Sequence, residues 1–459
     1  QALKALPVPR RMRWGDSDVE FVRPVHWVLL LHGTERVPAE ILGVRADRYS
    51  RGHRFHCNEP IDIAEPAAYV DTLRDTGRVL VDMDARRETI HNAVLAAGKS
   101  LGGRAHIDTG LLDEVTALVE WPVVISGGFD RRFLDVPPEA LVSSMQDHQK
   151  FFPVMDADGR LLPHFITVAN IESHEPDQVR AGNERVIRPR LEDAAFFWNQ
   201  DRKRSLASRT EELDQVTFQQ KLGSLGDKQK RIARISADIA AAAGGDTGHA
   251  QRAAAICKCD LLTSMVYEFP ELQGVMGGEY AAGSGEDEEV SQAVAEHYRP
   301  RFSQDQVPQS DIGALLGMAD RLDSLAGIFA CGETPTGDKD PYGLRRAALG
   351  VLRILIEGGI EIFRRKCVRV STRPRDRGPR QAVRIAETER ECRGTPVRIA
   401  SLIGGRIRSI RPIRHGGAAE ANDVRTGFVV VNDPARVIVG THVPSVAATC
   451  LKARRHRHS

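Results

Sequence analysis

The stretch GDKDPYGLRRAALGVLRILIE, from Gly337 to Glu357, shows most clearly how the second half of the chain is built. Asp340 is a suitable helix N-cap, and Pro341 suits the first helical position because its missing N–H is not needed there. From Leu344 to Ile356, apolar residues recur every three or four positions, which is typical of a helix with one buried face. We therefore predict a helix that begins at Pro341.

Two arginines, Arg345 and Arg346, stand in the first turns of this predicted helix. A positive charge is unfavourable at a helix N-terminus unless an anion lies opposite. The anion can be a carboxylate, and Asp320 and Asp323, one turn apart on the preceding predicted helix, are candidates for a structural ion pair with Arg346. It can also be a nucleic-acid phosphate. We favour the internal ion pair and keep phosphate as the alternative.

Helical patterning extends over most of the chain from residue 184 to residue 361. The segment from Glu184 to Leu213 is long and charged, and we expect it to bend or break near Pro189. Four further helices are predicted at residues 232–244, 253–269, 289–299 and 313–329. Together with the helix predicted in the stretch from Gly337 to Glu357, they form an all-α bundle joined by loops that contain Gly and Pro.

The first part of the chain alternates strand and helix signals, which predicts a mixed α/β domain. Strands are predicted at HWVLLLHG (26–33), VLVDM (79–83) and VVIS (123–126), and a hairpin at residues 150–170 with its turn near Gly159. A helix is predicted at residues 84–101, ended by Gly102 and Gly103.

The charge is unevenly distributed, although the net charge is only +2. From residue 363 onward there are about 22 Lys and Arg against about 7 Asp and Glu, and neither Tyr nor Trp occurs. Such a composition fits an RNA-binding extension or a segment without a folded core. We therefore predict a multidomain α+β protein. Its parts are a mixed α/β domain (1–183), a charged helical connector (184–230), an all-α domain (231–361) and an Arg-rich tail of unknown or no fold (362–459).

Composition also excludes some classes of protein. No run of about eighteen apolar residues predicts a membrane span, and nothing has the pattern of a signal peptide. The seven cysteines form no paired framework, which fits a reducing cytoplasm.

Catalytic and metal-binding candidates are weak. The glycine-rich stretch from Gly277 to Glu286 lacks the preceding strand and the Lys-Ser/Thr ending of a phosphate loop. His148 beside Lys150 is more often a loop hydrogen-bonding residue than an acid or a base. His297 lies on a helix near those of Asp260, Asp320 and Asp323, but one histidine among carboxylates is a poor ligand set for zinc. We predict no catalytic residue and no metal site.

Cationic residues are better candidates, for contact with RNA. Arg185, Arg188 and Arg190 lie around Pro189, and Arg202 and Lys203 follow three aromatic residues. Basic groups near aromatic rings suit RNA, because the cations bind phosphates and exposed rings stack on unpaired bases. The alternatives are a packed aromatic core and a solvated charged face. With Arg345 and Arg346, these five residues are the predicted RNA-binding set.

Several ordered blocks together resemble the beta subunit of bacterial heterotetrameric glycyl-tRNA synthetase, over about residues 11–357. They are RMRWGDSDVEFVRPVHWVLLLHG (11–33), RGHRFH (51–56), LVSSMQDHQKFFPV (141–154), NERVIRPRLEDAAFFW (183–198), KLGSLGDK (221–228), CDLLTSMVYEFPELQGVMGGEYA (259–281) and PTGDKDPYGLRRAALGVLRI (335–354). The resemblance implies an aminoacyl-tRNA synthetase subunit that acts in protein biosynthesis. It would bind glycine tRNA in a cytoplasmic α2β2 heterotetramer, while an alpha subunit binds ATP with Mg²⁺ and carries the ligase chemistry.

The same resemblance bears on the fold and on the alternatives. It implies an N-terminal module like that of the phenylalanine enzyme's beta chain, and a helical domain with the HD fold of phosphohydrolases. The position of the family's His-Asp dyad reads Cys259-Asp260 here, so a scaffold without metal chemistry is expected. A metal-dependent HD-type phosphohydrolase and an inactive truncated fragment are the alternatives.

Both ends of the chain depart from the resemblance. We expect Gln1 to be an internal residue of a longer protein. From about Phe363 the resemblance stops in mid-helix, where arginine content rises, and we expect a shifted reading frame or a faulty gene model there.

Overall fold

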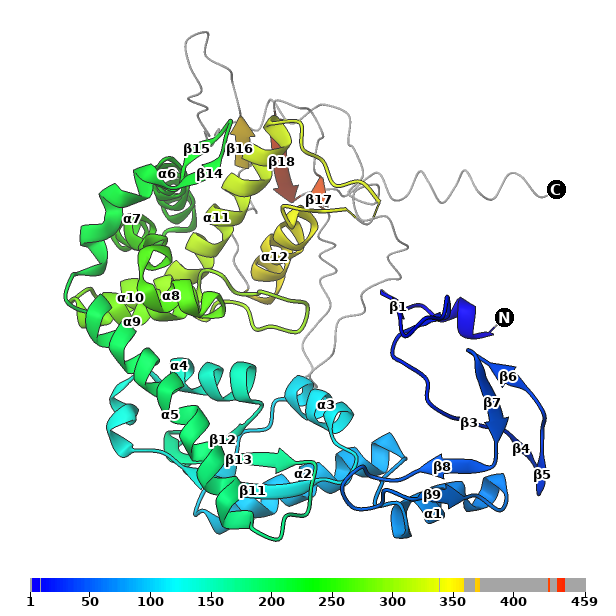
Figure 1. The fold of residues 1–459 in the computed structure, drawn as a ribbon. Coiled ribbons are helices and arrows are strands. Elements are labelled where there is room, and N and C mark those ends of the chain that lie inside the picture. The colour runs from blue at the N-terminus through cyan, green and yellow to red at the C-terminus, as the bar shows by residue number, and fades with distance from the viewer. Residues whose placement is uncertain are drawn as a thin grey trace, which may run out of the picture. The chain divides into compact units, whose positions relative to one another are not determined.

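The computed structural model (Figure 1) describes residues 2–8, 10–337 and 339–358, and three short strands further along the chain. The chain forms two compact units, which divide between Phe196 and Phe197, inside helix α5 (Pro176–Asp201). The predicted boundary between residues 183 and 184 lies in the same helix. The finer division into four parts stays a prediction.

The first unit is built around a four-stranded antiparallel sheet in the order β10-β12-β13-β11. Its strands are β10 (Arg104–Ala105), β11 (Val123–Gly128), β12 (Phe152–Met155) and β13 (Leu161–Ala169). Helices α2 (Met83–Ser100) and α3 (Thr109–Leu118) pack on it through one apolar core that includes Val94, Leu112 and Phe152. The predicted strand at 123–126, the helix at 84–101 and the hairpin are confirmed.

Shorter elements complete the first unit. They are η1 (Ala2–Ala5), β1 (Met12–Arg13), β2 (Glu20–Phe21), β3 (Val28–Leu29), β4 (Leu31–His32), β5 (Glu35–Arg36), β6 (Glu40–Ile41), β7 (Val44–Asp47), β8 (Tyr49–Arg51), β9 (Pro60–Asp62), η2 (Pro66–Ala68), α1 (Tyr69–Asp75), η3 (Arg131–Asp135), α4 (Pro138–Ser143) and the π-helical turn η4 (Ser144–His148). Strands β3, β7 and β6 form one small sheet, and the pairs β1-β2, β4-β5 and β8-β9 form three others.

Two predicted strands of the first unit are wrong or only partly right. Residues 26–33 form the two short strands β3 and β4, which pair with different partners, instead of one buried strand. Residues 79–82 form no strand. There, Val79 and Val81 pack on a small core with Ile63 and Leu73, so their apolar character comes from burial in a loop.

Helix α5 continues through Pro189, where the sequence predicts a bend or break. Pro189 is exposed, so the carbonyl that loses its N–H partner can bind water instead. An apolar stripe on the opposite side is buried at Ile187, Leu191, Ala194 and Trp198. Packing of this stripe on both sides of Pro189 offsets a proline cost of about 3 kcal/mol.

The second unit is a helical bundle with one β-hairpin, as the sequence patterning predicts. Its elements within residues 197–337 and 339–358 are η5 (Leu206–Gln215), β14 (Thr217–Gln219), β15 (Gly223–Ser224), α6 (Leu225–Ala243), α7 (Thr247–Ile256), η6 (Cys259–Leu262), α8 (Ser264–Glu268), η7 (Pro270–Leu272), α9 (Val275–Gly283), α10 (Glu288–Glu296), α11 (Asp311–Ala330) and α12 (Leu344–Glu357). Helix α11 is buried along most of its length and contacts α6, α7, α10 and α12 (Figure 1).

The predicted helix at residues 253–269 is divided into α7, η6 and α8. The Thr263 hydroxyl donates to the Asp260 carbonyl at 2.6 Å and accepts from the Val266 N–H at 3.3 Å. It therefore ends one helix and caps the next. No helix in the described ranges is both long enough and apolar enough to cross a membrane.

Beyond residue 358, the structure describes three short strands. Strands β16 (Val368–Ser371), β17 (Phe428–Val429) and β18 (Arg436–Thr441) pair antiparallel in the order β16-β18-β17. The predicted tail (362–459), with its proposed frame shift, otherwise lies outside the described residues.

Candidate functional site

An arginine pair stands on the exposed side of α5 in the first unit. The Glu184 carboxylate accepts from the Gly128 N–H of edge strand β11 at 2.9 Å, and the Arg180 guanidinium donates to the Ser126 carbonyl at 3.1 Å. These bonds hold the helix along the sheet. Arg185 and Arg188, one turn apart, are exposed, and neither makes a hydrogen bond or ion pair with any residue the structure describes. Their guanidinium groups are free for an anion.

The other predicted cations lie in different settings. Arg190 is also exposed on α5. Arg202 lies over the Trp198 ring, 4.9 Å from its centroid, and the Lys203 ammonium donates to the Gln200 amide oxygen at 2.7 Å. Trp198 is only 8% exposed and stacks on Tyr280, so this ring belongs to the core and is not open to a base.

Helix α12, which the sequence predicts to begin at Pro341, begins three residues later, at Leu344. Asp340 still serves it, because its carboxylate accepts from the N–H groups of Leu344 (2.8 Å) and Arg345 (2.9 Å) across a turn that ends at Gly343. Gly343 has a left-handed φ of 63°, which favours glycine. Arg346 is exposed and Arg345 is half-buried. The seven predicted cations are thus divided between the two units.

The prediction that Arg346 pairs with Asp320 or Asp323 is wrong. Among the described residues, no ion pair joins Arg346 to either aspartate. Lys228 of α6 lies 2.8 Å from one Asp320 oxygen and 3.3 Å from Asp323, and Arg231 binds Asp323 at 2.6 and 3.2 Å. Both aspartates therefore pair with cations of α6 and not with Arg346 of α12. Lys228 and Arg231 lie one turn apart on α6, so both reach the same side of that helix. Asp320 and Asp323 form their buried ion pairs with Lys228, Arg231 and Lys258 instead.

Lys258 completes this buried ion cluster, which we define as Lys228, Arg231, Lys258, Asp320 and Asp323. Its ammonium lies 2.6 Å from the second Asp320 oxygen. Burial would raise the pKa of the Asp320 carboxyl, but Lys228 and Lys258 together hold it well below its usual value. The carboxylate is therefore ionised and each of its oxygens faces an ammonium.

The Lys258 ammonium also lies 3.0 Å from Nε2 of His297, a fully buried residue. Burial and the nearby Lys258 charge lower the pKa of His297 well below its ordinary value, so the ring is neutral. Nδ1 lies 2.7 Å from the Val294 carbonyl and can only donate to it, which leaves Nε2 to accept from Lys258. The lone pairs that a metal ion would need on His297 and Asp320 thus face an ammonium.

Asp260, at the position where the family's dyad is expected, is buried as well. Its carboxylate accepts from the Gly274 N–H at 2.5 Å, and burial raises its pKa to about 6. Within the described ranges, no group of three His, Cys, Asp or Glu side chains is arranged to hold a metal ion.

The glycine-rich stretch is helical, because α9 includes Gly277 and Gly278. A Cβ atom on Gly278 would lie 2.7 Å from the Ala295 Cβ and 2.9 Å from the Ser291 carbonyl of α10. These glycines allow two helices to pack closely. The Gly278 N–H donates to the Gly274 carbonyl at 2.9 Å, so this glycine serves the helix and its packing on α10.

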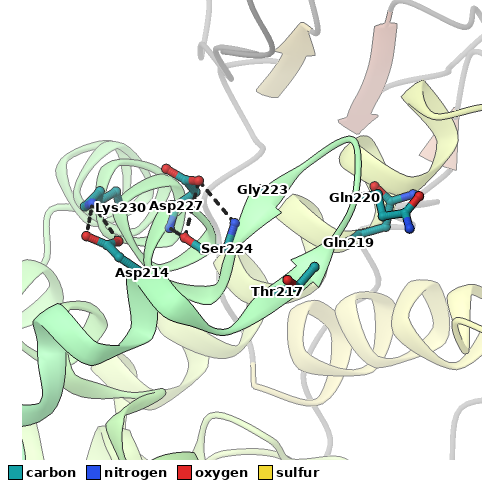
Figure 2. A pocket seen from close by; sticks show the side chains of 8 residues that line it. All are labelled: Asp214, Thr217, Gln219, Gln220, Gly223, Ser224, Asp227 and Lys230. Carbon is teal, nitrogen blue, oxygen red and sulfur yellow. Dashed lines mark hydrogen bonds and ion pairs between the residues drawn. The ribbon is translucent and has the colours of Figure 1, made fainter.

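A polar pocket of about 510 Å³ lies between the β14-β15 hairpin and the start of α6 (Figure 2). The Lys230 ammonium binds the Asp214 carboxylate at 2.9 Å on one side, and Ser224 and Asp227 form a reciprocal helix cap on another. Thr217, Gln219 and Gln220 line the hairpin side. Lys230 and Asp214 occupy each other and Asp227 is occupied by Ser224, so the pocket offers mainly amides and hydroxyls.

Sequence reasoning missed Lys228 and Lys258, the two lysines on which the buried ion cluster depends. A signal was available for Lys258, which interrupts the apolar run AAAICKCDLL. A lysine is almost never fully buried without a partner, so its place in such a run predicts a buried carboxylate opposite. Lys228 gave no comparable signal, because KLGSLGDK reads as an exposed turn.

Comparison with known proteins gives a consistent result. The sequence model of the family described as "Glycyl-tRNA synthetase beta subunit" matches residues 1–400. This match extends beyond residue 354, where the last of the sequence blocks that resemble the family ends. The glycine–tRNA ligase beta subunit of Chromohalobacter salexigens is 55% identical over 371 residues, covering 81% of this chain and 54% of that protein. That of Hahella chejuensis is 53% identical over 368 residues, with 80% and 53% covered. The chain thus spans about half the length of these relatives.

One solved structure, of a predicted HD superfamily hydrolase from an uncultured Thermotogales bacterium, shares 20% sequence identity with the chain. The structural alignment covers 34% of this chain and 87% of the hydrolase chain, with a TM-score of 0.22. That score is too low to support an argument about the fold.

Proposed function

The chain belongs to the glycyl-tRNA synthetase beta subunit family, and on that premise we propose that it binds glycine tRNA as part of a glycine–tRNA ligase. The observation that carries the proposal is the 55% identity, over 81% of this chain, to a protein named glycine–tRNA ligase beta subunit. Arg185 and Arg188 on α5 support it, because both are exposed and neither has a partner among the described residues, and such guanidinium groups bind phosphates by charge-assisted hydrogen bonds. Arg190, Arg202, Lys203, Arg345 and Arg346 are further candidate contacts.

The proposed contribution of this chain is orientation. Cations on a rigid helix would hold the tRNA body so that its acceptor end reaches an activated glycine on the partner subunit. Holding two reactants in the right geometry can account for several kcal/mol of a reaction barrier. No residue of this chain is then required to take part in bond making.

We place ATP and its Mg²⁺ on the alpha subunit. The phosphate-loop candidate from Gly277 to Glu286 lies within helix α9 up to Gly283, and it lacks the preceding strand and the Lys-Ser/Thr ending of a phosphate loop. The proposed assembly is an α2β2 heterotetramer with glycine tRNA, in the cytoplasm.

The alternative of a metal-dependent HD-type phosphohydrolase is disfavoured. The Lys258 ammonium lies between His297 and Asp320, two of the residues that such a centre would use. If the helical unit descends from an HD fold, we infer that a lysine now supplies the positive charge that a metal would supply there. Metal analysis, and phosphatase assays on His297→Asn and Asp320→Asn variants, test this alternative.

Reconstitution tests the proposed function directly. The chain is mixed with a catalytic alpha subunit, ATP, Mg²⁺ and glycine tRNA, and glycine attachment is measured with and without the chain. We expect attachment only when both subunits are present. The proposal fails if the alpha subunit gains no activity and the chain binds no glycine tRNA, the outcome expected of an inactive fragment. Formation of glycyl-adenylate by the chain alone would overturn the assignment of the chemistry to its partner.

A further inference from the structure

A closed ring of contacts joins four loops of the first unit. The buried His53 donates its backbone N–H to the Gly77 carbonyl at 2.7 Å, and its Nε2 lies 2.6 Å from the Asn170 carbonyl. The Asn170 side chain accepts from the Trp121 N–H at 2.9 Å. Arg78, which follows Gly77, lies over the Trp121 ring at 5.2 Å from its centroid. Residues far apart in sequence thus fix one another.

The loop that carries His53 is pressed against its neighbour. A Cβ atom on Gly52 would lie 2.7 Å from the Gly77 carbonyl oxygen, so only glycine fits this backbone contact. His56 accepts from the Glu172 N–H at 3.0 Å, and its ring lies 4.7 Å from that of His53. The backbone between these two histidines is therefore rigid, and it fixes the positions from which the intervening side chains extend.

Those side chains, Arg54 and Phe55, point to solvent. Phe55 is 64% exposed, and the Arg54 guanidinium lies over its ring at 5.1 Å from the centroid. Arg54 follows His53 and Arg78 follows Gly77, the two residues that a backbone hydrogen bond of 2.7 Å joins. Among the described residues, neither forms an ion pair.

Arg78 also has an unusual backbone, with a left-handed φ of 54°. This conformation is strained for a residue with a Cβ atom, and such strain concentrates at functional sites. The two loops that the His53–Gly77 hydrogen bond joins thus each carry one arginine-on-aromatic contact, and one of the loops is strained at Arg78. A hydrophobic ring held in water under an arginine that forms no ion pair among the described residues has no evident benefit to folding.

The surrounding charges favour a small partner. Asp75 is held by Arg74 in two hydrogen bonds of 2.7 and 3.0 Å. Glu120 and Glu172 are exposed on the same loops and would repel a duplex backbone laid across the junction. A single nucleotide brings one phosphate instead of two charged strands, so it meets less of this repulsion.

We propose that Arg54, Phe55 and Arg78, which we term the Phe55 platform, bind an unpaired RNA nucleotide. The base would stack on the Phe55 ring and a guanidinium plane, and its phosphate would accept from the free arginine N–H groups. The proposal rests on the proposed function, because it assigns one part of the RNA contact. It commits to single-stranded nucleotides and not to the helical stem.

The test uses the full chain and three probes at one salt concentration: glycine tRNA, a short single-stranded RNA and an RNA duplex of equal charge. We expect Phe55→Ala to weaken binding of the single-stranded RNA by about 5-fold to 100-fold, the usual range for loss of one base stack. Phe55→Tyr should restore binding, Arg78→Ala should weaken it, and duplex binding should change little. Phe302→Ala removes a similarly exposed ring, 62% exposed, from the second unit and serves as the control.

The possible results separate the two proposals. Suppose that the wild-type chain binds tRNA, and that the Phe55→Ala and Arg78→Ala variants bind single-stranded RNA as tightly as wild type does. This result overturns the platform and leaves the proposed function intact. Single-stranded binding that needs Phe55, without any binding of glycine tRNA, supports the platform and overturns the proposed function. A chain that binds none of the three probes overturns both. Thermal melting of each variant confirms that a loss of binding is not a loss of fold.

Discussion

The Lys258 ammonium lies 2.6 Å from the Asp320 carboxylate, with the lysine side chain only 3% exposed. Removing two charges from water costs several kcal/mol per ion, and their attraction offsets this cost only where the remaining hydrogen bonds are also made. Here His297 accepts from Lys258, and the Lys228 ammonium forms an ion pair with the other Asp320 oxygen at 2.8 Å, although that oxygen accepts no hydrogen bond. Loss of any one member should therefore leave a buried charge without its partner.

Replacing Lys258 with methionine should destabilise the second unit strongly. The substitution keeps the apolar stem but leaves Asp320 short of one partner, and breaking a buried pair in this way costs about 3–5 kcal/mol. Urea unfolding followed by far-UV circular dichroism measures the difference. Lys230→Met is the matched control, because the Lys230 pair with Asp214 is exposed and such pairs contribute at most about 1 kcal/mol. Equal effects of the two substitutions would contradict the buried-pair assignment.

The stability of the chain should depend on pH through His297. Its folded-state pKa lies well below the ordinary 6.5 because of burial and Lys258, so below pH 6.5 only the unfolded chain takes up the proton. Its contribution is present above the unfolded pKa and is lost as pH falls, with a slope of up to about 1.4 kcal/mol per pH unit. Unfolding free energies at several pH values between 5 and 6.5 should show a smaller slope in His297→Asn than in wild type. Comparison with wild type also separates His297 from Asp260, whose raised pKa gives the opposite slope.

His249 should act with the opposite sign. Its ring nitrogens lie 2.9 Å from Glu289 and 3.3 Å from Asp287 at the start of α10, and the hydrogen bond to Glu289 is the main cause of its raised pKa. The stabilisation is fully present below the unfolded pKa of 6.5 and is lost as pH rises through the folded value. His249→Asn should reduce stability at pH 5.5 more than at pH 8. Because the ring is partly exposed, 1 M NaCl should shrink the effect. An effect that grows with pH would refute the assignment.

Two glycines of α9 should respond differently to the same substitution. A Cβ atom on Gly278 would contact Ala295 and the Ser291 carbonyl at under 3 Å, so Gly278→Ala forces α9 and α10 apart. We expect the free energy of unfolding to fall by about 1–3 kcal/mol. Gly283→Ala, at the end of the same helix, meets no atom within 4 Å and should be neutral or stabilising by up to about 1 kcal/mol. Chemical unfolding of both variants provides the comparison, and a neutral Gly278→Ala would contradict the packing role.

Local signals in the sequence predict much of the fold, and side-chain partners across the bundle are much harder to predict. The hairpin around Gly159 and the helix ended by Gly102 follow from turn and cap residues, whose effects act within a few positions. The apolar residues Val79, Leu80 and Val81 resemble a strand because burial in a loop and burial in a sheet require the same residue types. The continuity of α5 through Pro189 depends on a core that no local pattern shows.

The candidate sites divide in the same way. Exposure of Arg185 and Arg188 could be anticipated from their place on a charged helix face. The partners of Asp320 could not, because helix α11 is buried and contacts four other helices, and its periodicity does not say which of them supplies the cation. Order along the chain favours Arg346, because its helix follows α11 in sequence. The Phe55 platform depends on contacts between His53, Gly77 and Asn170, which are distant in sequence.

Removing Arg185 and Arg188 together should weaken tRNA binding in a way that depends on salt. Each cation that binds a phosphate releases a counterion, so the slope of log affinity against log salt should fall by about 1 for each arginine–phosphate pair that the substitutions remove. For Arg185→Ala/Arg188→Ala we expect a slope smaller by about 2 and the largest reduction of affinity at low salt, measured by filter binding with glycine tRNA between about 50 and 200 mM salt. Arg74→Ala is the control, because Asp71 and Asp75 already pair with Arg74 and leave it little capacity for phosphate. A double variant with the wild-type slope and an unchanged melting temperature would exclude this face of α5 from the RNA contact.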